Sequence, residues 1–361
     1  MPSPDLAPVL PEAPLTIALE PAHNILNSML LLSRADDYSG LSDWVTATAA
    51  RLGPELLHRN RLVLEGLHYA TMPDSSYPSF WAFLDAYAAT DPVALRDRLL
   101  RAVWNHARKE PGPGAPPPPS SPAELITSLQ SYLDFCMYYF NGKYDLEIEA
   151  EAYSYLVDPP RMHALILGHL RAIWTEHVAA EWERSRPRLQ ETMAALGKLD
   201  LAGLAPREAV ELVVGQELGQ QWDEIFSESE QIILVPSPHL GPYVTKFRDG
   251  GVLRIFFGAR LPAGVARGSS ELSRADLLVR LGALNDDTRL RVLAMLAREG
   301  ELCAPELMVR LDLHQSAVSR HLRQLVAAGY VSERWRDGSK CYRLNRERID
   351  DTLRAIQRFL A

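Results

Sequence analysis

A short polar run near the C-terminus carries the side chains of this sequence that are best suited to contact nucleic acid. Its hydroxyl and guanidinium groups recur at steps of three and four residues, so a helix would present them together on one face. Arginine can donate two hydrogen bonds to O6 and N7 of guanine, and small serines let a helix approach closely and donate to phosphate or base edges. The residues predicted to contact DNA on this helix are Gln315, Ser316, Ser319, Arg320 and Arg323.

For each of these residues an ordinary structural role stays open. The two arginines could be solvated surface charges, and the two serines could satisfy local backbone groups. His321 lies between the polar face and the apolar stripe, so a half-buried, hydrogen-bonded role and a phosphate contact are equally compatible with its position. The pattern as a whole favours DNA contact for the arginines and serines.

A basic segment follows the polar run. Two strand-like stretches, 330–336 and 340–344, are joined by Asp337-Gly338-Ser339, and Asp-Gly between alternating stretches is typical of a β-hairpin. A basic hairpin beside such a helix is suited to grip the phosphates of the flanking groove. The hairpin cations are Arg334, Arg336, Lys340 and Arg343, and the first three are predicted to contact DNA.

The surrounding sequence predicts helices that position these groups. Asp286 is suited to cap one helix, Gly300 to end it, and Pro305 fits only the first turn of the next. The following turn, 312–314, is so short that the flanking helices must cross steeply, as in a helix-turn-helix. The apolar stripe of the second of these helices consists of Val318, Leu322, Leu325 and Val326.

Two segments, LGALNDDTRLRVL at 281–293 and QSAVSRHLRQLVAAGYV at 315–331, resemble the arsenic-repressor (ArsR) family of bacterial winged-helix regulators. The resemblance covers about residues 272–360 and includes the helix, turn, recognition helix and wing in order. It implies a transcriptional regulator that binds double-stranded DNA as a homodimer on a near-palindromic operator.

Family members pair through their first and last helices, and the last helix here has an apolar seam that a lone terminal helix would expose. The alternative is that this seam packs on its own domain. The residues predicted to form the dimer contact are Leu277, Leu281, Ile349, Leu353, Ile356 and Leu360.

The family's metal sites are incomplete in this chain. Metal-sensing members place two cysteines one residue apart at the start of the third helix, where this sequence reads Cys303-Ala304-Pro305. A second family site uses Asp, His and Glu on the last helix, and residues 350–361 contain no histidine. One thiolate cannot build a closed site, so we expect no metal and no cofactor.

The three cysteines, Cys136, Cys303 and Cys341, show no paired spacing. We therefore expect small packed side chains, no disulfide framework and a reducing compartment, which for this chain would be the cytoplasm. No apolar stretch approaches the roughly 20 residues that cross a bilayer, and the N-terminus lacks the pattern of a signal peptide, so no membrane partner is expected.

Charge is divided unevenly along the 361 residues. The net charge is -8, but residues 271–361 hold 16 basic and 13 acidic side chains, which leaves 22 basic and 33 acidic before them. The basic part could approach a polyanion and the acidic part would be held away from it. We expect a flexible lead-in at 1–14, a helical sensor or dimerisation domain at 15–262, a linker at 263–270 and a winged helix-turn-helix domain at 271–361.

The predicted fold class is mainly α. The first domain is expected to be helical, with an exposed Pro-rich loop at 111–122 and a small antiparallel sheet near its end. The strand-like runs of that sheet are 231–236 and 252–257, with a further candidate at 243–247.

Aromatic and acidic side chains of the first domain are given structural roles. An aromatic stripe at helical spacing, Tyr132, Phe135 and Tyr139, is assigned to the core, with a ligand pocket as the alternative. The acidic run of Glu147, Glu149 and Glu151 is assigned to a solvated surface. His163, His169 and His177 lack metal-ligand spacing and are given no role.

These features favour a repressor-like, non-enzymatic regulator whose first domain senses a non-metal effector, either a small molecule or a protein, or holds the dimer. The alternative is an enzymatic or protein-binding first domain fused to a DNA-binding module. No nucleophile elbow, phosphate loop or dinucleotide fingerprint occurs in that part of the sequence.

Overall fold

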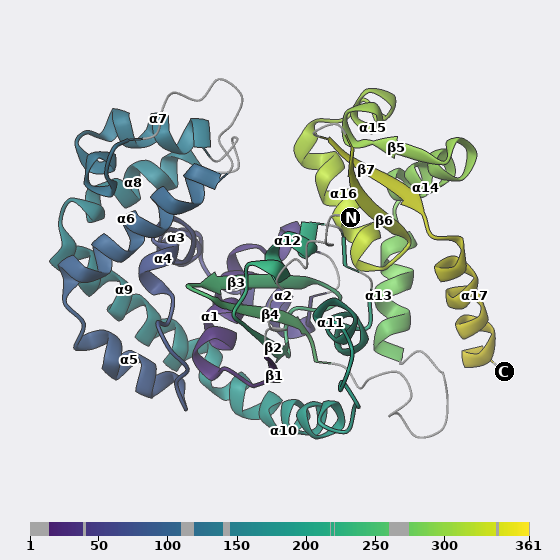
Figure 1. Ribbon diagram of the computed structural model, residues 1–361, viewed down its shortest axis with the longest axis horizontal. Helices are drawn as coiled ribbons and strands as arrows, with labels where there is room; N and C mark the ends of the chain where they lie inside the picture. Colours follow the sequence, from purple (N-terminus) through teal and green to yellow (C-terminus); the bar gives the residue numbers. More distant parts are fainter. Residues whose placement is uncertain are drawn as a thin grey trace, which may run out of the picture. The chain divides into compact units, whose positions relative to one another are not determined.

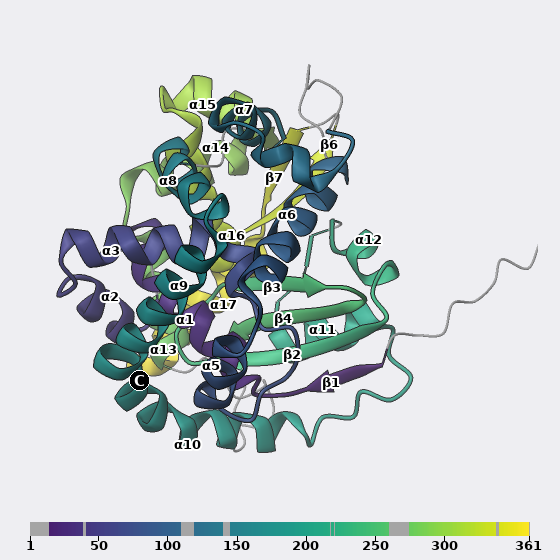
Figure 2. The ribbon, with the colours of Figure 1, turned by 90° about the vertical axis from the view of Figure 1, so that its left-hand side faces the viewer.

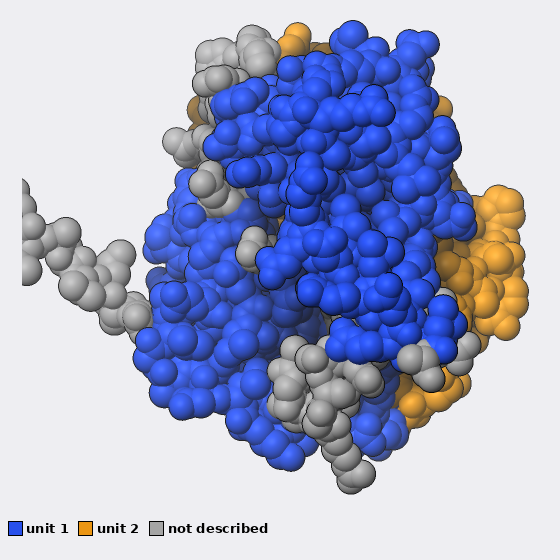
Figure 3. All heavy atoms as spheres, turned by 90° about the vertical axis from the view of Figure 1, so that its right-hand side faces the viewer, with its two compact units in different colours: residues 1–19, 36–42, 186–361 blue, residues 20–35, 43–185 orange. Residues whose placement is uncertain are grey.

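A computed structural model describes residues 14–38, 41–109, 119–139, 145–216, 218–219, 221–259, 274–336 and 339–360. The chain divides into two compact units, one of residues 1–19, 36–42 and 186–361 and the other of residues 20–35 and 43–185 (Figure 3). The predicted linker at 263–270 and nearly all of the predicted lead-in lie outside the described residues. The domain boundaries predicted from the sequence therefore stay predictions.

The second unit is helical throughout its described part (Figures 1 and 2). Several helices begin with proline, whose fixed φ suits a first turn, and Asp91 caps α6 by accepting a hydrogen bond from the Ala94 amide at 2.8 Å. The elements are α1 (Pro21–Ser33), α2 (Asp43–Ala49), α3 (Pro54–Arg61), η2 (Leu62–Gly66), α4 (His68–Thr71), α5 (Phe80–Ala88), α6 (Pro92–Lys109), η3 (Pro122–Ile126), α7 (Leu129–Tyr139), α8 (Leu146–Leu156), α9 (Pro159–Ile173), η4 (Trp174–Val178) and the start of α10 (Ala179–Leu196).

A buried polar network ties three of these helices together. The Asn60 side-chain amide of α3 donates to the Met29 carbonyl at 2.7 Å and to the Ser33 hydroxyl at 2.6 Å, both in α1. Its carbonyl oxygen lies 2.9 Å from Nε2 of His169 in α9, so Nε2 is the nitrogen that carries the proton. Burial lowers the pKa of His169 to about 4, which keeps the ring neutral at neutral pH.

The aromatic stripe of α7 and the acidic run of α8 meet in the core. Tyr132 and Phe135 are buried, as predicted, whereas the side chain of Tyr139 lies outside the described part. Glu149 was wrongly assigned to a solvated surface, because its carboxylate is buried and accepts a hydrogen bond from the Tyr132 hydroxyl at 2.7 Å. Burial raises the pKa of Glu149 to about 7.

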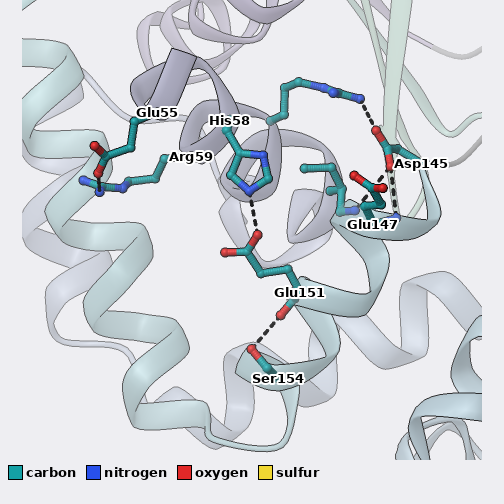
Figure 4. Close-up of polar contacts among 9 residues, drawn as sticks. Glu55, His58, Arg59, Asp145, Glu147, Glu151 and Ser154 are labelled. Carbon is teal, nitrogen blue, oxygen red and sulfur yellow. Dashed lines mark hydrogen bonds and ion pairs between the residues drawn. The ribbon is translucent and has the colours of Figure 1, made fainter. Parts of the chain in front are cut away.

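The other two glutamates of the run lie on the outer side of α8 (Figure 4). Glu147 is exposed, and Glu151 lies 2.6 Å from Nε2 of His58 in α3. Arg61 forms a further ion pair at 2.8 Å with Asp145, which caps α8 by accepting from the Glu147 and Ile148 amides. His58 and Arg61 of α3 thus contact one side of this acidic segment. Glu149 alone of the three glutamates points inward, because helical spacing turns it by about 200° from its neighbours at i±2.

The first unit contains a four-stranded sheet in the order β1-β2-β4-β3. Its strands are β1 (Leu15–Ile17), β2 (Gln231–Ser237), β3 (Val244–Asp249) and β4 (Val252–Gly258). The three strand-like runs of the sequence are all confirmed, and β3 and β4 form the expected antiparallel hairpin. The sheet as a whole is mixed and not antiparallel as predicted, because β2 pairs with β4 in parallel and β1 adds to β2 in parallel.

Helices α11 (Pro206–Val214) and α12 (Gln221–Ser227) supply the apolar layer that covers one face of this sheet. Val210 and Trp222 pack with Leu234 and Ile255 in one buried cluster. The strands β2 and β4 are buried along almost their whole length, which is why both read as continuous apolar runs rather than as alternating ones.

The C-terminal part of the first unit has a winged helix-turn-helix fold, as predicted (Figure 1). Asp286 caps α14 by accepting from the Arg289 amide at 2.9 Å, Gly300 ends it with a φ of 88°, and Asp312 turns the chain in the left-handed region between α15 and α16. The elements are α13 (Arg274–Leu284), α14 (Asp287–Glu299), β5 (Glu301–Cys303), α15 (Ala304–Leu311), α16 (Gln315–Ala327), β6 (Val331–Arg336), β7 (Ser339–Leu344) and α17 (Arg346–Leu360).

The wing is a three-stranded antiparallel sheet in the order β5-β7-β6. The sequence predicted the β6–β7 hairpin but not β5, which has only three residues. Cys303 of β5 and Cys341 of β7 are direct partners in the register and form a disulfide. The expectation that the cysteines form no disulfide was therefore wrong, because strand pairing brings together two residues that lie 38 positions apart.

Candidate nucleic-acid interface

The polar residues of α16 that are predicted to contact DNA lie on its outer face. Val318, Leu322 and Leu325 are buried in the core of the winged helix, packed with α14, α15 and the wing. Helical geometry turns the intervening positions away from that core. The five residues predicted to contact DNA, Gln315, Ser316, Ser319, Arg320 and Arg323, are all exposed.

A buried arginine fixes the inner face of α16, and the sequence analysis did not single it out. Arg289 of α14 donates to the Ala283 carbonyl at 2.7 Å and to the Gly282 carbonyl at 2.9 Å, and it also hydrogen-bonds the side chain of Gln324. These contacts join the end of α13, the start of α14 and the middle of α16. Arg289 therefore positions the recognition helix without facing solvent.

His321 is buried, which favours a structural role over the phosphate contact that the sequence left as the alternative. It is 9% exposed, and its Nδ1 lies 3.5 Å from the Asp286 carboxylate. Burial lowers the pKa of His321, while Asp286 acts in the opposite direction. A ring placed against the N-cap of α14 does not reach toward the solvent face that carries Arg320 and Arg323.

Each predicted phosphate-binding cation of the wing lies beside an acidic side chain. Arg334 contacts Glu301 through Nε at 2.5 Å and Nη2 at 2.8 Å, and Arg336 contacts the same carboxylate at 2.9 Å. These arginines hold the pKa of Glu301 below its usual value, with the Arg334 hydrogen bond as the main cause. Lys340 lies 3.2 Å from Glu333.

The ends of the wing cations remain in contact with solvent. The side chains of Arg334, Arg336 and Lys340 are 55%, 47% and 40% exposed. Ion pairs of solvent-exposed cations are weak, so a phosphate could displace the carboxylates. The arrangement places basic groups on the wing and keeps them from repelling one another.

Arg323 also has an aromatic neighbour within its unit. Its guanidinium carbon lies 5.0 Å from the centre of the Tyr38 ring, and that ring makes an edge-to-face contact with Tyr243 at 4.8 Å. A cation–π contact at an exposed site contributes about 0.5–1 kcal/mol. Arg323 must leave this contact in order to bind a base.

The residues predicted to form the dimer contact differ in how exposed they are in the single chain. Leu277 is buried in its own unit, at 6% exposed, and Ile349 and Ile356 are half-buried. Leu281, Leu353 and Leu360 are exposed, at 36%, 53% and 76%. α17 packs against α13 through its other face, where Thr352 and Ala355 are buried, so part of the seam stays open to solvent.

Hydrogen bonds connect α13 and α17 with the C-terminal end of α16. The Tyr330 hydroxyl lies 3.2 Å from both the Arg280 carbonyl of α13 and Oγ1 of Thr352 in α17. Arg348 of α17 donates to the Ala328 carbonyl at 3.3 Å. Gly329 takes a φ of 77° there, and a Cβ at this position would lie 2.8 Å from Nε of Arg348. The two helices predicted to form the dimer contact thus hold the end of the recognition helix.

Among the described residues, no group of three or more His, Cys, Asp or Glu side chains could hold a metal ion. Cys303, which matches the family's metal-binding position, is bonded to Cys341. Within the same described ranges, no helix is long and apolar enough to cross a membrane.

Comparison with known proteins places similarity in the C-terminal part of the chain. A family model described as bacterial regulatory protein, arsR family, matches residues 286–333. The arsenic resistance transcriptional regulator ArsR1 of Pseudomonas putida is 48% identical over 64 residues, which are 18% of this chain and 50% of that protein. The chain therefore spans half the length of this relative.

The match to this chain covers a larger share of two further relatives. The arsenic resistance transcriptional regulator ArsR2 of Pseudomonas putida is 38% identical over 86 residues, which are 22% of this chain and 75% of that protein. The arsenical resistance operon repressor of Staphylococcus aureus is 36% identical over 86 residues, which are 24% of this chain and 81% of that protein.

Proposed function

Because the chain belongs to the arsR family of bacterial regulatory proteins, we propose that it is a sequence-specific, repressor-like regulator that binds double-stranded DNA as a homodimer. The family membership agrees with the resemblance found in the sequence. The relatives are named as regulators and repressors of arsenic resistance, and the similarity to them is limited to the winged-helix part.

The observation that carries this proposal is the division of α16 into two faces. Its apolar side chains are buried in the domain core, while Gln315, Ser316, Ser319, Arg320 and Arg323 are exposed. A major groove admits one α-helix, and side chains at these positions would meet base edges and phosphates together. In the wing, Arg334, Arg336 and Lys340 would bind phosphates on the flanking strand.

Dimer formation would use the exposed part of the α13–α17 surface. Leu353 and Leu360 lie outward on α17, and Leu281 lies outward on α13. A twofold contact through these side chains would place two α16 helices on two half-sites. Such half-sites lie about 34 Å apart, which is one helical turn of DNA.

The helical first domain would bias the winged helix between binding and non-binding states in response to a non-metal effector. Support comes from its size, since a winged helix needs far fewer residues to bind DNA. The helical unit of residues 20–35 and 43–185, which lies within this predicted domain, also contains two π-helical segments, η2 and η4. This geometry is frequent at functional sites. We place the protein in the cytoplasm, without enzymatic activity or a cofactor.

Selection of duplexes from a random pool by the full chain tests the proposal directly. We expect enrichment of a near-palindromic sequence, protection of two half-sites about 10 base pairs apart, and a complex that contains two chains. Failure to enrich any sequence would contradict sequence-specific binding. Enrichment of a site bound by one chain would contradict the dimer alone.

A further inference from the structure

The two cysteines of the winged helix form a covalent link between the outer strand β5 and the central strand β7 of the wing. Cys303 is the last residue of β5 and directly precedes α15, the first helix of the helix-turn-helix. Cys341 lies opposite it in β7, the central strand of the wing. Their disulfide therefore ties the central strand of the wing to the strand that leads into the helix-turn-helix.

A cation lies against one of the two sulfur atoms. Nη2 of Arg336 is 3.1 Å from Sγ of Cys303, and Nη1 of the same side chain is 2.9 Å from the Glu301 carboxylate. A guanidinium beside a thiol favours the thiolate, which is the form that attacks disulfides. Cys303 is 7% exposed and Cys341 is fully buried, so Cys303 is the sulfur that an outside reagent meets first.

We propose that Cys303 and Cys341 form a reversible dithiol–disulfide switch that sets the affinity of the wing for DNA; the effect on DNA rests on the function proposed above. In compartments that keep thiols reduced, disulfides are usually transient and often sense the redox state. The bond lies inside the DNA-binding domain rather than in the helical first domain.

The oxidant in this proposal is a low-molecular-weight disulfide. The Cys303 thiolate attacks one of its sulfur atoms, which forms a mixed disulfide and releases one small thiolate. The Cys341 thiolate then attacks Sγ of Cys303 and displaces the second small thiolate. Two protein thiols are oxidised to one disulfide, the small disulfide is reduced to two thiols, and the two protons pass to those thiols.

Coupling to DNA follows from the charge beside Arg336. In the disulfide form the sulfur atoms are neutral, and Arg336 can exchange Glu301 for a phosphate. After reduction, a Cys303 thiolate adds a negative charge and forms a charge-assisted hydrogen bond with Arg336. We therefore expect the reduced protein to bind DNA more weakly, by about three- to tenfold at low salt, with a smaller salt dependence.

The third cysteine provides a matched control. Cys136 lies in the helical unit, buried beside Glu149 and Tyr132, with its sulfur 3.9 Å from the Glu149 carboxylate. Burial is the main reason that the pKa of the Cys136 thiol is raised far above its usual value, and the Glu149 charge acts in the same direction. A Cys136→Ser variant should therefore keep the full redox response.

The test uses the full chain equilibrated with mixtures of reduced and oxidised glutathione, followed by alkylation of free thiols and mass spectrometry. We expect two free thiols to disappear together as the mixture becomes more oxidising. The mass should remain that of one chain, which would show that the disulfide is intramolecular. Both thiols remaining free in every mixture, or a link between two chains, would overturn the switch.

DNA affinity is measured on the same samples with a selected duplex and with a random-sequence duplex. Wild type and Cys136→Ser should bind more tightly when oxidised, and Cys303→Ser/Cys341→Ser should bind equally in all mixtures. Equal binding by oxidised and reduced wild type, or a response that persists in the double variant, overturns the coupling. An absence of DNA binding in every state refutes the proposed function and the coupling with it, while the thiol measurement still decides the switch.

Discussion

Glu301 and Arg334 form a two-point ion pair at the base of the wing, with Nε and Nη2 of the guanidinium 2.5 and 2.8 Å from the two carboxylate oxygens. Arg336 reaches the same carboxylate. One acidic residue therefore restrains two cations that we propose bind phosphate, and it competes with DNA for both.

Replacing Glu301 by Gln should strengthen DNA binding. The substitution removes the competing charge while keeping a hydrogen-bond acceptor of similar size, so we expect about three- to tenfold tighter binding to all sequences at low salt, with a steeper salt dependence. Binding isotherms at several salt concentrations measure both quantities. Glu299→Gln, which removes the same charge but releases Arg310 of α15 instead of a wing cation, is the control. Unchanged binding by Glu301→Gln would show that the wing does not contact phosphate.

Replacing Arg320 and Arg323 by Ala should abolish binding to a selected duplex. Both side chains are exposed on α16 and neither contributes to the core, so the circular dichroism spectrum and the oligomeric state should not change. Arg298→Ala, at an exposed position of α14, should bind as wild type does. If the double variant retains its affinity, α16 is not the recognition helix.

Replacing Lys340 by Ala should weaken all DNA sequences to a similar extent. Loss of one phosphate contact lowers the salt slope by about one unit. Because Lys340 is paired with Glu333, the same change also removes a positive charge from beside that carboxylate, which adds to the loss. Lys340→Ala combined with Glu333→Gln should recover part of the affinity but not the slope. A change confined to one sequence would instead indicate a base contact.

A charge on the outer face of α17 should separate the proposed dimer. Leu353→Glu places a carboxylate at a position that is 53% exposed in the single chain and would be buried between two chains. We expect a monomer by sedimentation and at least tenfold weaker binding to a two-half-site duplex. Val309→Glu, at an 82% exposed apolar position of α15, should leave the oligomeric state unchanged. A dimer that survives Leu353→Glu must use another surface.

Glu149 should make stability fall as pH rises. Its pKa is about 7 in the folded protein, because of burial, against an ordinary value of 4.5. The folded state thus binds the proton more tightly. The contribution of Glu149 to the free energy of unfolding therefore falls by about 3 kcal/mol between about pH 4.5 and 7 and is constant above that range. Urea unfolding of wild type and Glu149→Gln over this range measures the difference.

The comparison with Glu149→Gln is needed because two histidines with a lowered pKa act in the opposite direction. Burial lowers the pKa of His68 and of His169 to about 4, so both favour the folded state above pH 6.5 and lose that contribution as pH falls toward 4. Both histidines are present in wild type and in Glu149→Gln, so their contributions cancel when the two free energies of unfolding are subtracted. A difference that does not vary with pH would show that Glu149 is ionised in the folded protein.

The winged helix was predictable from the sequence because its signals are local. The Asp286 cap, the Gly300 stop and the apolar stripe of α16 each specify an element within a few residues, and all three are confirmed. The exposure of the polar face of α16 follows from the same periodicity.

Features that depend on long-range pairing were missed or wrongly assigned. The disulfide requires β5, a three-residue strand that periodicity cannot detect, to pair with β7. Glu149 is buried because α7 supplies Tyr132 as a donor, and an acidic run on a helix gives no sign of such a partner. The continuous apolar runs of β2 and β4 indicate that both strands are buried, but they do not specify which strands pair or in which direction.

The hydrogen bonds of Tyr330 and Arg348 have a consequence for the spacing of operators. They fix the end of α16 to the helices proposed to form the dimer contact. At Gly329 the backbone lies so close to the Arg348 side chain that a Cβ would clash with it. In a dimer of two such chains, the two α16 helices would therefore be held at a fixed separation and orientation. Adding half a helical repeat between the half-sites would turn the second one to the opposite side of the duplex, out of reach of its α16.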